Sequence, residues 1–316
     1  MKRITIIPAV LLLLVTAAAA AQQPSVLIIP ERFDFSTPPE QHPQYYIMES
    51  RLTTFSQAGE VTGTDTYRLN LEYTPNPDRE SGAGVWRCGR LSVSEGDSLT
   101  RDVPSLQGWE HSVHPQGYDE KGQVFGIEHS FFENITCSDG TPLPIDKRYN
   151  VYNTFLDFHA LTSVFPQASA EGNSIQDLHH IGDTTAHYAS FTRPPTNLGS
   201  SIKEGSYFQN GRIMLELKGV SLAGGELCAL VGYDSGESSF KMVLEPFPGM
   251  QVTGKGRSRY CGDIYRSLDD NWVKKVDMKE TVISGTDIPM TGETIYSVVE
   301  REISIRNISR EEYESL

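Results

Sequence analysis

The chain has 316 residues, of which 38% are hydrophobic and 22% are charged, with 27 basic and 41 acidic residues. This length supports one large hydrophobic core or two modest ones. The formal charge of −14 argues against nucleic acid or an anionic membrane as a partner, because both demand clustered Lys and Arg. We therefore expect an acidic surface and no nucleic-acid function.

Residues 1–21 have the pattern of a secretory signal peptide. Lys2 and Arg3 form the charged start, residues 4–15 form the apolar centre, and the alanines at 17–21 form a small-residue cleavage region. The apolar run is too short for a transmembrane helix, and no later segment is apolar enough to span a bilayer. We expect cleavage after Ala21 and a soluble, extracytoplasmic protein, periplasmic or secreted, with no integral membrane segment.

The first half of the mature chain predicts an extended lead-in and then a β block. Residues 22–44 contain five prolines and no periodicity, which predicts an extended segment. Residues 45–166 form the first block. Alternation of apolar and polar residues predicts strands within YYIMESRLTTF, TDTYRLNLEYT, GVWRCGRLSVSEG and QVFGIEHSFFENITC. A helix is predicted for residues 150–165, where apolar residues partly follow the 3.6-residue period and Pro166 stops the segment.

The second block, residues 183–316, follows a connection at 167–182 rich in Gly, Ser and His. Within it, TAHYASFT predicts one strand, and residues 211–305 predict five or six more, separated by turn residues. Gly219 shifts the alternation, as a β-bulge does, and ELCALVGYD is apolar on both faces, which favours a central strand.

The predicted fold class is mainly β, or β-rich α+β. Short connections between long alternating strands favour a long antiparallel meander or a curved half-barrel sheet with one short helical segment. The sequence leaves open whether the two β blocks form one sheet or two domains.

Four cysteines in an exported chain make disulfides the expected state. We favour Cys228–Cys261, because both lie in strands of the same meander, and Cys88–Cys137 as its counterpart in the first block. The alternative is that some remain free as small buried side chains. No C-x-x-C spacing occurs, so neither a zinc site nor redox chemistry is predicted.

One short motif suggests a hydrolase. Residues 96–99, Gly-Asp-Ser-Leu, resemble the nucleophile block of the GDSL/SGNH esterases, and Asp177 and His180 have the D-x-x-H spacing that such enzymes use. That resemblance implies Ser98 as nucleophile, with His180 as base and Asp177 as the orienting carboxylate. Those enzymes resemble doubly wound α/β folds, whereas the surroundings here are a β-meander, and more than a hundred residues follow the D-x-x-H.

Histidines and a basic row are the remaining polar candidates. Five histidines could bind a metal by residue type alone, because they lack the helical H-E-x-x-H pattern: His111, His114, His179, His180 and His187. For His129 and His187, within predicted strands, we expect structural hydrogen bonds. The row of Lys255, Arg257 and Arg259 suits an anionic ligand, but we favour a solvated strand face as its explanation. No metal and no cofactor are predicted.

The second block also resembles a known arrangement. GELCALVGYD, GRSRYCGDIYRSL and NWVKKVDMKE are similar to segments of uncharacterised exported bacterial β-rich proteins. At the level of a long antiparallel meander, the final third resembles the LolA/LppX-type lipoprotein-carrier half-barrel. That resemblance implies a concave face with a pocket for an acyl chain or another apolar ligand, and it carries over no functional residue.

The leading hypothesis is a non-enzymatic, extracytoplasmic binding or structural protein with an apolar small molecule or lipid as partner. Six residues represent the expected ligand surface on the concave side of the sheet: Ile213, Leu215, Phe240, Met242, Tyr260 and Ile264. One alternative is the secreted hydrolase that uses Ser98. The other is a surface assembly component that pairs with a protein partner through an exposed strand edge.

Overall fold

The computed structural model describes residues 29–76, 84–96, 100–113, 127–194, 202–247 and 249–316. Contacts divide the chain into Met1–Pro30 and Glu31–Leu316, and the second unit holds the fold described below. In the described residues this unit contains one antiparallel sheet of thirteen strands, which confirms the predicted mainly β fold.

The strands follow one another along the chain with mostly short connections. In the first half they are β1 (Gln44–Phe55), β2 (Val61–Thr74), β3 (Val85–Glu95), β4 (Thr100–Asp102) and β5 (Glu110–His111). In the second half they are β6 (Thr184–Ala186), β7 (Tyr207–Gln209), β8 (Met214–Ala223), β9 (Glu226–Asp234), β10 (Ser238–Phe247), β11 (Met250–Ser267), β12 (Val273–Ile288) and β13 (Glu293–Ile308).

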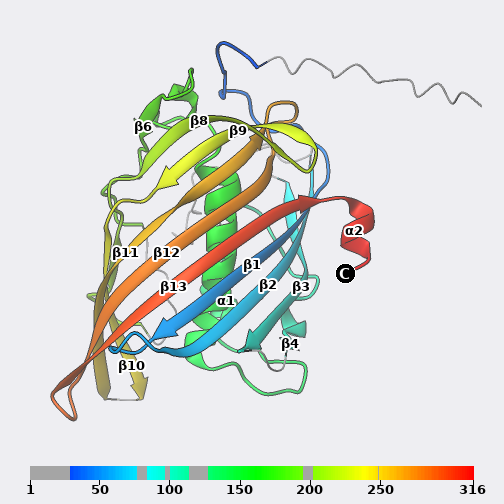
Figure 1. Ribbon diagram of the computed structural model, residues 1–316. Helices are drawn as coiled ribbons and strands as arrows, with labels where there is room; N and C mark the ends of the chain where they lie inside the picture. The colour runs from blue at the N-terminus through cyan, green and yellow to red at the C-terminus, as the bar shows by residue number, and fades with distance from the viewer. Residues whose placement is uncertain (1–28, 77–83, 97–99, 114–126, 195–201, 248) are drawn as a thin grey trace, which may run out of the picture. The chain divides into compact units, whose positions relative to one another are not determined.

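The two β blocks form one continuous sheet. Its order is β4-β3-β2-β1-β13-β12-β11-β9-β8-β6, so the first strand of the first block pairs with the last strand of the second. That β1–β13 pairing is antiparallel, with Met48 opposite Ile305. Figure 1 shows the sheet curving around helix α1 (Ile145–His159), with β1 and β13 side by side near its middle.

Strand β11 gives the sheet a branch. Its second half, from Cys261 to Ser267, pairs with β9, whereas its first half pairs with β10. In the first half of this strand small or apolar residues alternate with charged ones, so that one face is covered and the other is solvated. The predicted bulge is also confirmed, because the β8–β9 register shifts between Leu217 and Gly219.

Helix α1 covers part of the concave face. Pro144 precedes the helix, and a π-helical turn (Ala160–Val164) extends it as far as Phe165, just before Pro166. The buried side chains Val151, Phe155 and Phe158 follow the helical period and pack into the core. The helix begins five residues before the predicted start, since its first turn is polar and lies outside the periodic apolar stripe.

The second helix, α2 (Arg310–Glu314), follows β13 directly. Ser309 caps it by accepting a hydrogen bond from the Glu312 amide at 3.1 Å. Neither helix in the described part of the chain combines the length and the apolar run that crossing a bilayer requires.

The described part of the lead-in is extended, but it is also part of the core. Phe33 and Phe35 are 3% and 1% exposed. Hydrogen bonds from the Phe33 amide to the His179 carbonyl and from the Glu40 amide to the Asp270 carbonyl hold residues 31–43 against the connection and the second block. We call these residues the strap.

Two predicted strands differ from the structure. Residues 129–132 form a 3-10 turn instead of a strand, because the rings of both Phe131 and Phe132 pack on Trp109, which consecutive strand residues cannot do. Two further single 3-10 turns lie at Pro104–Leu106 and Ile175–Asp177. Of the strand predicted for TAHYASFT, residues 185–192, only Thr185 and Ala186 are in a strand, β6.

The disulfide prediction is wrong, because all four cysteines are free. In the β9–β11 register Cys228 is opposite Ser267, whereas Cys261 is opposite Asp234. Six residues of strand therefore separate the two sulfurs, roughly 20 Å at about 3.3 Å per residue. Cys88 and Cys137 are both buried, as the alternative of small buried thiols describes.

Candidate anion-binding pocket

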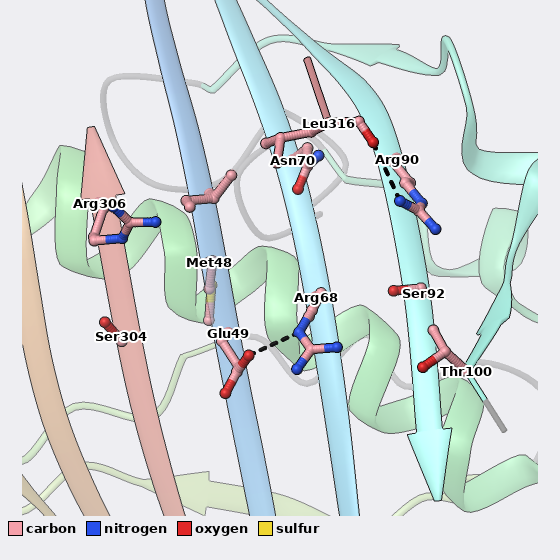
Figure 2. Close-up of a pocket in the computed structure, with 11 residues that line it drawn as sticks. Met48, Glu49, Arg68, Asn70, Arg90, Ser92, Thr100, Ser304, Arg306 and Leu316 are labelled. Carbon is pink, nitrogen blue, oxygen red and sulfur yellow. Dashed lines mark hydrogen bonds and ion pairs between the residues drawn. The ribbon is translucent and has the colours of Figure 1, made fainter. Parts of the chain in front are cut away.

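A hollow of 450 Å³ lies on the sheet face that is turned away from helix α1. In β1 the side chains of Tyr46 and Met48 are buried on the helix side, so Ile47 and Glu49 point to the other face. Figure 2 shows the hollow in front of β13, β1, β2 and β3, with α1 behind them. Its lining consists of Ile47, Met48, Glu49, Arg68, Asn70, Arg90, Ser92, Thr100, Ser304, Arg306 and Leu316. We call it the arginine pocket.

The strand register explains why a hollow forms there. One transverse row runs from Arg306 through Ile47 and Asn70 to Arg90, because these residues are opposite one another on four neighbouring strands. The next row on the same face contains Arg68, with serines at both of its ends. Ile47 and Asn70 lie between the two arginines of the first row, and the serines lie on either side of Glu49 and Arg68 in the second. These shorter side chains leave space between the long arginines.

Helix α2 brings the last residues of the chain to the pocket. The Tyr313 ring packs against the Tyr45 ring with centroids 5.2 Å apart. The Leu316 carbonyl accepts a hydrogen bond from Arg90 Nη1 at 3.4 Å, and Leu316 thereby adds an apolar wall (Figure 2). The position of α2 depends on Gly89, since a Cβ there would lie 2.1 Å from the Tyr313 hydroxyl oxygen.

Each arginine of the pocket already has one acidic partner. Arg68 Nε donates to Glu49 Oε2 at 2.7 Å, and Arg90 Nε donates to Asp102 Oδ1 at 2.9 Å. Arg306 Nη2 lies 3.6 Å from the Glu312 carboxylate. These three arginines have side chains 53%, 49% and 53% exposed, so the pairs contribute little to stability and exchange readily with another anion.

The chemistry of the pocket favours an anionic group with an apolar portion. A guanidinium carries five N–H donors in a planar fork that matches carboxylate and phosphate oxygens, and each pair described above uses only part of that fork. Ile47 and Leu316 supply apolar contact beside these donors. The arrangement therefore suits an amphiphile that ends in a carboxylate or phosphate.

A second charged cluster lies on the helix side of the sheet. Arg301 on β13 binds two carboxylates, with Nη1 at 2.5 Å from Asp157 Oδ2 and Nη2 at 2.7 Å from Glu280 Oε2. The Arg301 guanidinium also lies over the Tyr260 ring, 5.4 Å from its centroid. Burial raises the pKa of Asp157 to about 6, although Arg301 acts in the opposite direction. Because its guanidinium is occupied by both acids, we interpret Arg301 as a link between α1 and the sheet.

Two buried histidines form a direct contact. His111 Nε2 and His159 Nε2 are 2.6 Å apart, between β5 and the end of α1. One imidazole donates its N–H to the lone pair of the other, which requires that at least one ring be neutral. Burial lowers the pKa of His111 to about 3 and the pKa of His159 also falls, first through burial and then through the charge of His111.

The residues of the predicted hydrolase site are only partly described. Ser98 lies outside the described residues. The Asp177 carboxylate accepts from the Thr185 hydroxyl at 3.4 Å, and the His180 ring lies 3.5 Å from Asp183. Asp177 and His180 thus each have a described partner other than the one that the triad assigns.

The remaining polar candidates are dispersed. His179 Nδ1 lies 3.3 Å from the Phe33 carbonyl oxygen, and His187 Nδ1 accepts from the Ala189 amide at 3.3 Å. His114 lies outside the described residues. Within the described ranges, no three His, Cys, Asp or Glu side chains cluster as metal ligands.

The other two sequence candidates have local partners. The His129 ring packs on Tyr152, with centroids 4.6 Å apart. The basic row of β11 is paired with acids, since Lys255, Arg257 and Arg259 lie 3.9, 2.7 and 2.5 Å from Asp287, Glu237 and Asp234.

The expected apolar ligand surface divides into two parts. Ile213, Leu215 and Ile264 are at most 1% exposed and belong to the core that α1 completes. Phe240 and Met242 lie on β10 and are only partly buried. Tyr260, also partly buried, lies beside Arg301.

Sequence reasoning missed both arginine sites. Arg301 lies at an inward position of β13 between Val299 and Ile303. A charged residue in this apolar row was the sequence signal that could have indicated a buried ion pair. Arg68, Arg90 and Arg306 occupy outward positions, where a solvated face has the same pattern. Only the strand order, which places β13 beside β1, brings the three together.

Comparisons with known proteins do not identify a family. No family model matches the chain, and no curated protein matches it. One solved structure with partial likeness is the outer membrane channel DcaP of Acinetobacter baumannii, at 7% identity and a TM-score of 0.19, covering 84% of this chain and 96% of that one. An engineered protein described under asymmetric conductivity has 9% identity and a TM-score of 0.19, covering 84% and 99%. Neither likeness supports a shared fold or function.

Proposed function

We propose that this protein is an extracytoplasmic, non-enzymatic binding protein whose ligand is an anionic amphiphile held in the arginine pocket. The observation that carries the proposal is the convergence of Arg68, Arg90 and Arg306 around one hollow that also has apolar walls. This clustering stands out in a chain of net charge −14, where basic side chains are the minority. The pattern of residues 1–21 supports export.

Different residues of the pocket would bind the anionic group and the apolar chain of the ligand. The guanidinium groups would bind the carboxylate or phosphate, with release of the exposed pairs to Glu49 and Glu312. Ile47 and Leu316 would contact the first part of the apolar chain. Nothing in this arrangement requires a nucleophile or a general base, so the proposed role is binding without turnover.

Calorimetric titration with dodecyl phosphate tests the proposal. We expect one molecule bound per chain, and a loss of at least about tenfold in affinity for each of Arg68→Gln, Arg90→Gln and Arg306→Gln. The reason is that a hydrogen bond to a charged group contributes about 1.5–3 kcal/mol, and 1.4 kcal/mol corresponds to a factor of ten.

The matched control is Arg257→Gln. Arg257 also lies on an outward strand face and pairs with a glutamate at 2.7 Å, but it is not part of the pocket. The Arg257→Gln variant should bind dodecyl phosphate with the affinity of the wild type. Dodecyl maltoside, which has the same alkyl chain without the charge, should bind weakly to the wild-type protein. Absence of dodecyl phosphate binding, or an equal loss in the control variant, would exclude the pocket as the ligand site.

A further inference from the structure

Arg266 is the largest side chain in the described residues that is fully buried, with 0% exposure. It lies near the end of β11, opposite Ala229 of β9, and a register shift after Tyr265 places it opposite Val273 of β12. Both of these partners are core residues. Arg266 follows the core residue Ile264 by two positions, so the alternation of the strand turns its guanidinium to the core side, where Phe35 and Thr37 of the strap contact it.

The strap supplies few contacts to this guanidinium. Arg266 Nη2 donates to the Thr37 carbonyl at 2.8 Å, and the guanidinium carbon lies 5.1 Å from the centroid of the Phe35 ring. The Nε and Nη1 groups are buried and have no hydrogen-bond partner among the described residues. Most of the donor capacity of Arg266 is therefore unused in the interior.

Two carboxylates, those of Asp34 and Asp270, act on the charge of Arg266 through space, but among the described residues neither forms a hydrogen bond to its guanidinium. Asp34 accepts from the amide and the hydroxyl of Ser36, and Asp270 accepts from Lys274 Nζ at 2.7 Å and from the Trp272 amide at 3.0 Å. Burial lowers the pKa of Arg266 to about 10, so the side chain is still charged at neutral pH. A buried cation of this kind is stable only when an anion compensates it.

We propose that a small monovalent anion, of the size and charge of chloride, binds to Arg266 beneath the strap. Such an ion accepts hydrogen bonds from the unused N–H groups and neutralises the charge. An ion of this size is favoured over an organic carboxylate because Arg266 has no surface open to solvent. The anion would also stabilise the strap, whose Thr37 carbonyl shares the same guanidinium.

Thermal unfolding in sodium chloride and in sodium gluconate at equal ionic strength tests this site. A ligand that binds only the folded state stabilises it, and we expect a melting temperature roughly 2–4 °C higher in chloride. Arg266→Met should remove that difference, because Met fills an interior site without a charge. Arg193→Met is the matched control, since Arg193 is exposed and also stacks over an aromatic ring, that of Tyr207 at 4.6 Å.

Crystals grown in sodium bromide give a second measurement on the wild-type protein, which does not depend on the folding of the Arg266 variant. The expected result is an anomalous bromide peak beside Arg266. A peak only at the arginine pocket, equal melting temperatures in the two salts, or a chloride effect that persists in Arg266→Met would each overturn the proposal.

Discussion

At the scale of single residues, the buried histidine pair determines how stability depends on pH. His111 and His159 have pKa values below the ordinary value of about 6.5, because burial disfavours their charged forms. Well above pH 6.5, neither the folded nor the unfolded chain binds protons at these two rings. As the pH falls below 6.5 the unfolded chain binds protons and the folded chain does not, so folding stability decreases.

Urea unfolding between pH 6.5 and pH 5 tests this expectation. The cost of each histidine rises toward about 1.4 kcal/mol per pH unit as the unfolded ring becomes fully protonated, so over this range the mean slope of the wild type should exceed that of the double variant His111→Phe/His159→Phe by roughly 2 kcal/mol per unit. Asp157 has a raised pKa and acts in the opposite direction, but its contribution is common to both proteins and cancels in the difference. Equal slopes would show that the pair is protonated without cost.

Single residues also show where sequence reasoning stops. Ile303 and Ile305 lie two residues apart and are both buried on the core side of β13, as the alternation of a strand requires. The alternation gave no sign that Arg301 on the same side would pair with two carboxylates, or that Arg266 would form no hydrogen bond to one among the described residues, because the partners come from distant segments. The Cys228–Cys261 prediction failed for a related reason, since neighbouring strands do not bring two residues together unless the register does.

At the scale of elements, α2 is the part that shapes the proposed ligand site. Gly89→Ala would place a methyl group 2.1 Å from the present position of the Tyr313 hydroxyl oxygen, so Tyr313 must move. We expect faster amide exchange in residues 310–314 and weaker binding of dodecyl phosphate, because Leu316 would leave the pocket wall. Global stability should change little, since no residue of α2 is buried in the core.

Gly63→Ala is the matched control for this substitution. Gly63 is also a strand glycine, but an added Cβ there meets no atom within 4 Å. Hydrogen exchange measured by mass spectrometry distinguishes the two variants. Unchanged exchange of residues 310–314 in Gly89→Ala would show that α2 does not depend on the open space at this glycine.

Most elements could be predicted from the sequence, and their partners could not. The two-residue alternation identified β1, β2 and β8–β13, and the bulge at Gly219 came from a shift in the same pattern. Alternation describes faces, not neighbours, so the branch in which β9 and β10 share β11 carried no signal. In the segment 129–132, consecutive aromatic residues imitated a strand although both pack on one ring.

At the scale of the whole Glu31–Leu316 unit, the β1–β13 pairing is the decisive feature. It joins the two β blocks into one sheet and brings Arg306 to within two strands of Arg68. Two ion pairs link helix α1 to the strands around this pairing. Lys147 lies 2.5 Å from Asp65 of β2, and Asp157 lies 2.5 Å from Arg301 of β13. The helix fills part of the concave face, so the opposite face carries the proposed binding site.

The most direct test of this account is a crystal structure of the protein with dodecyl phosphate. The account predicts the phosphate oxygens within hydrogen-bond distance of Arg68, Arg90 and Arg306, with the first carbons of the chain against Ile47 and Leu316. A ligand found on the concave face, with its chain along Phe240 and Met242 and its phosphate away from the three arginines, would contradict it.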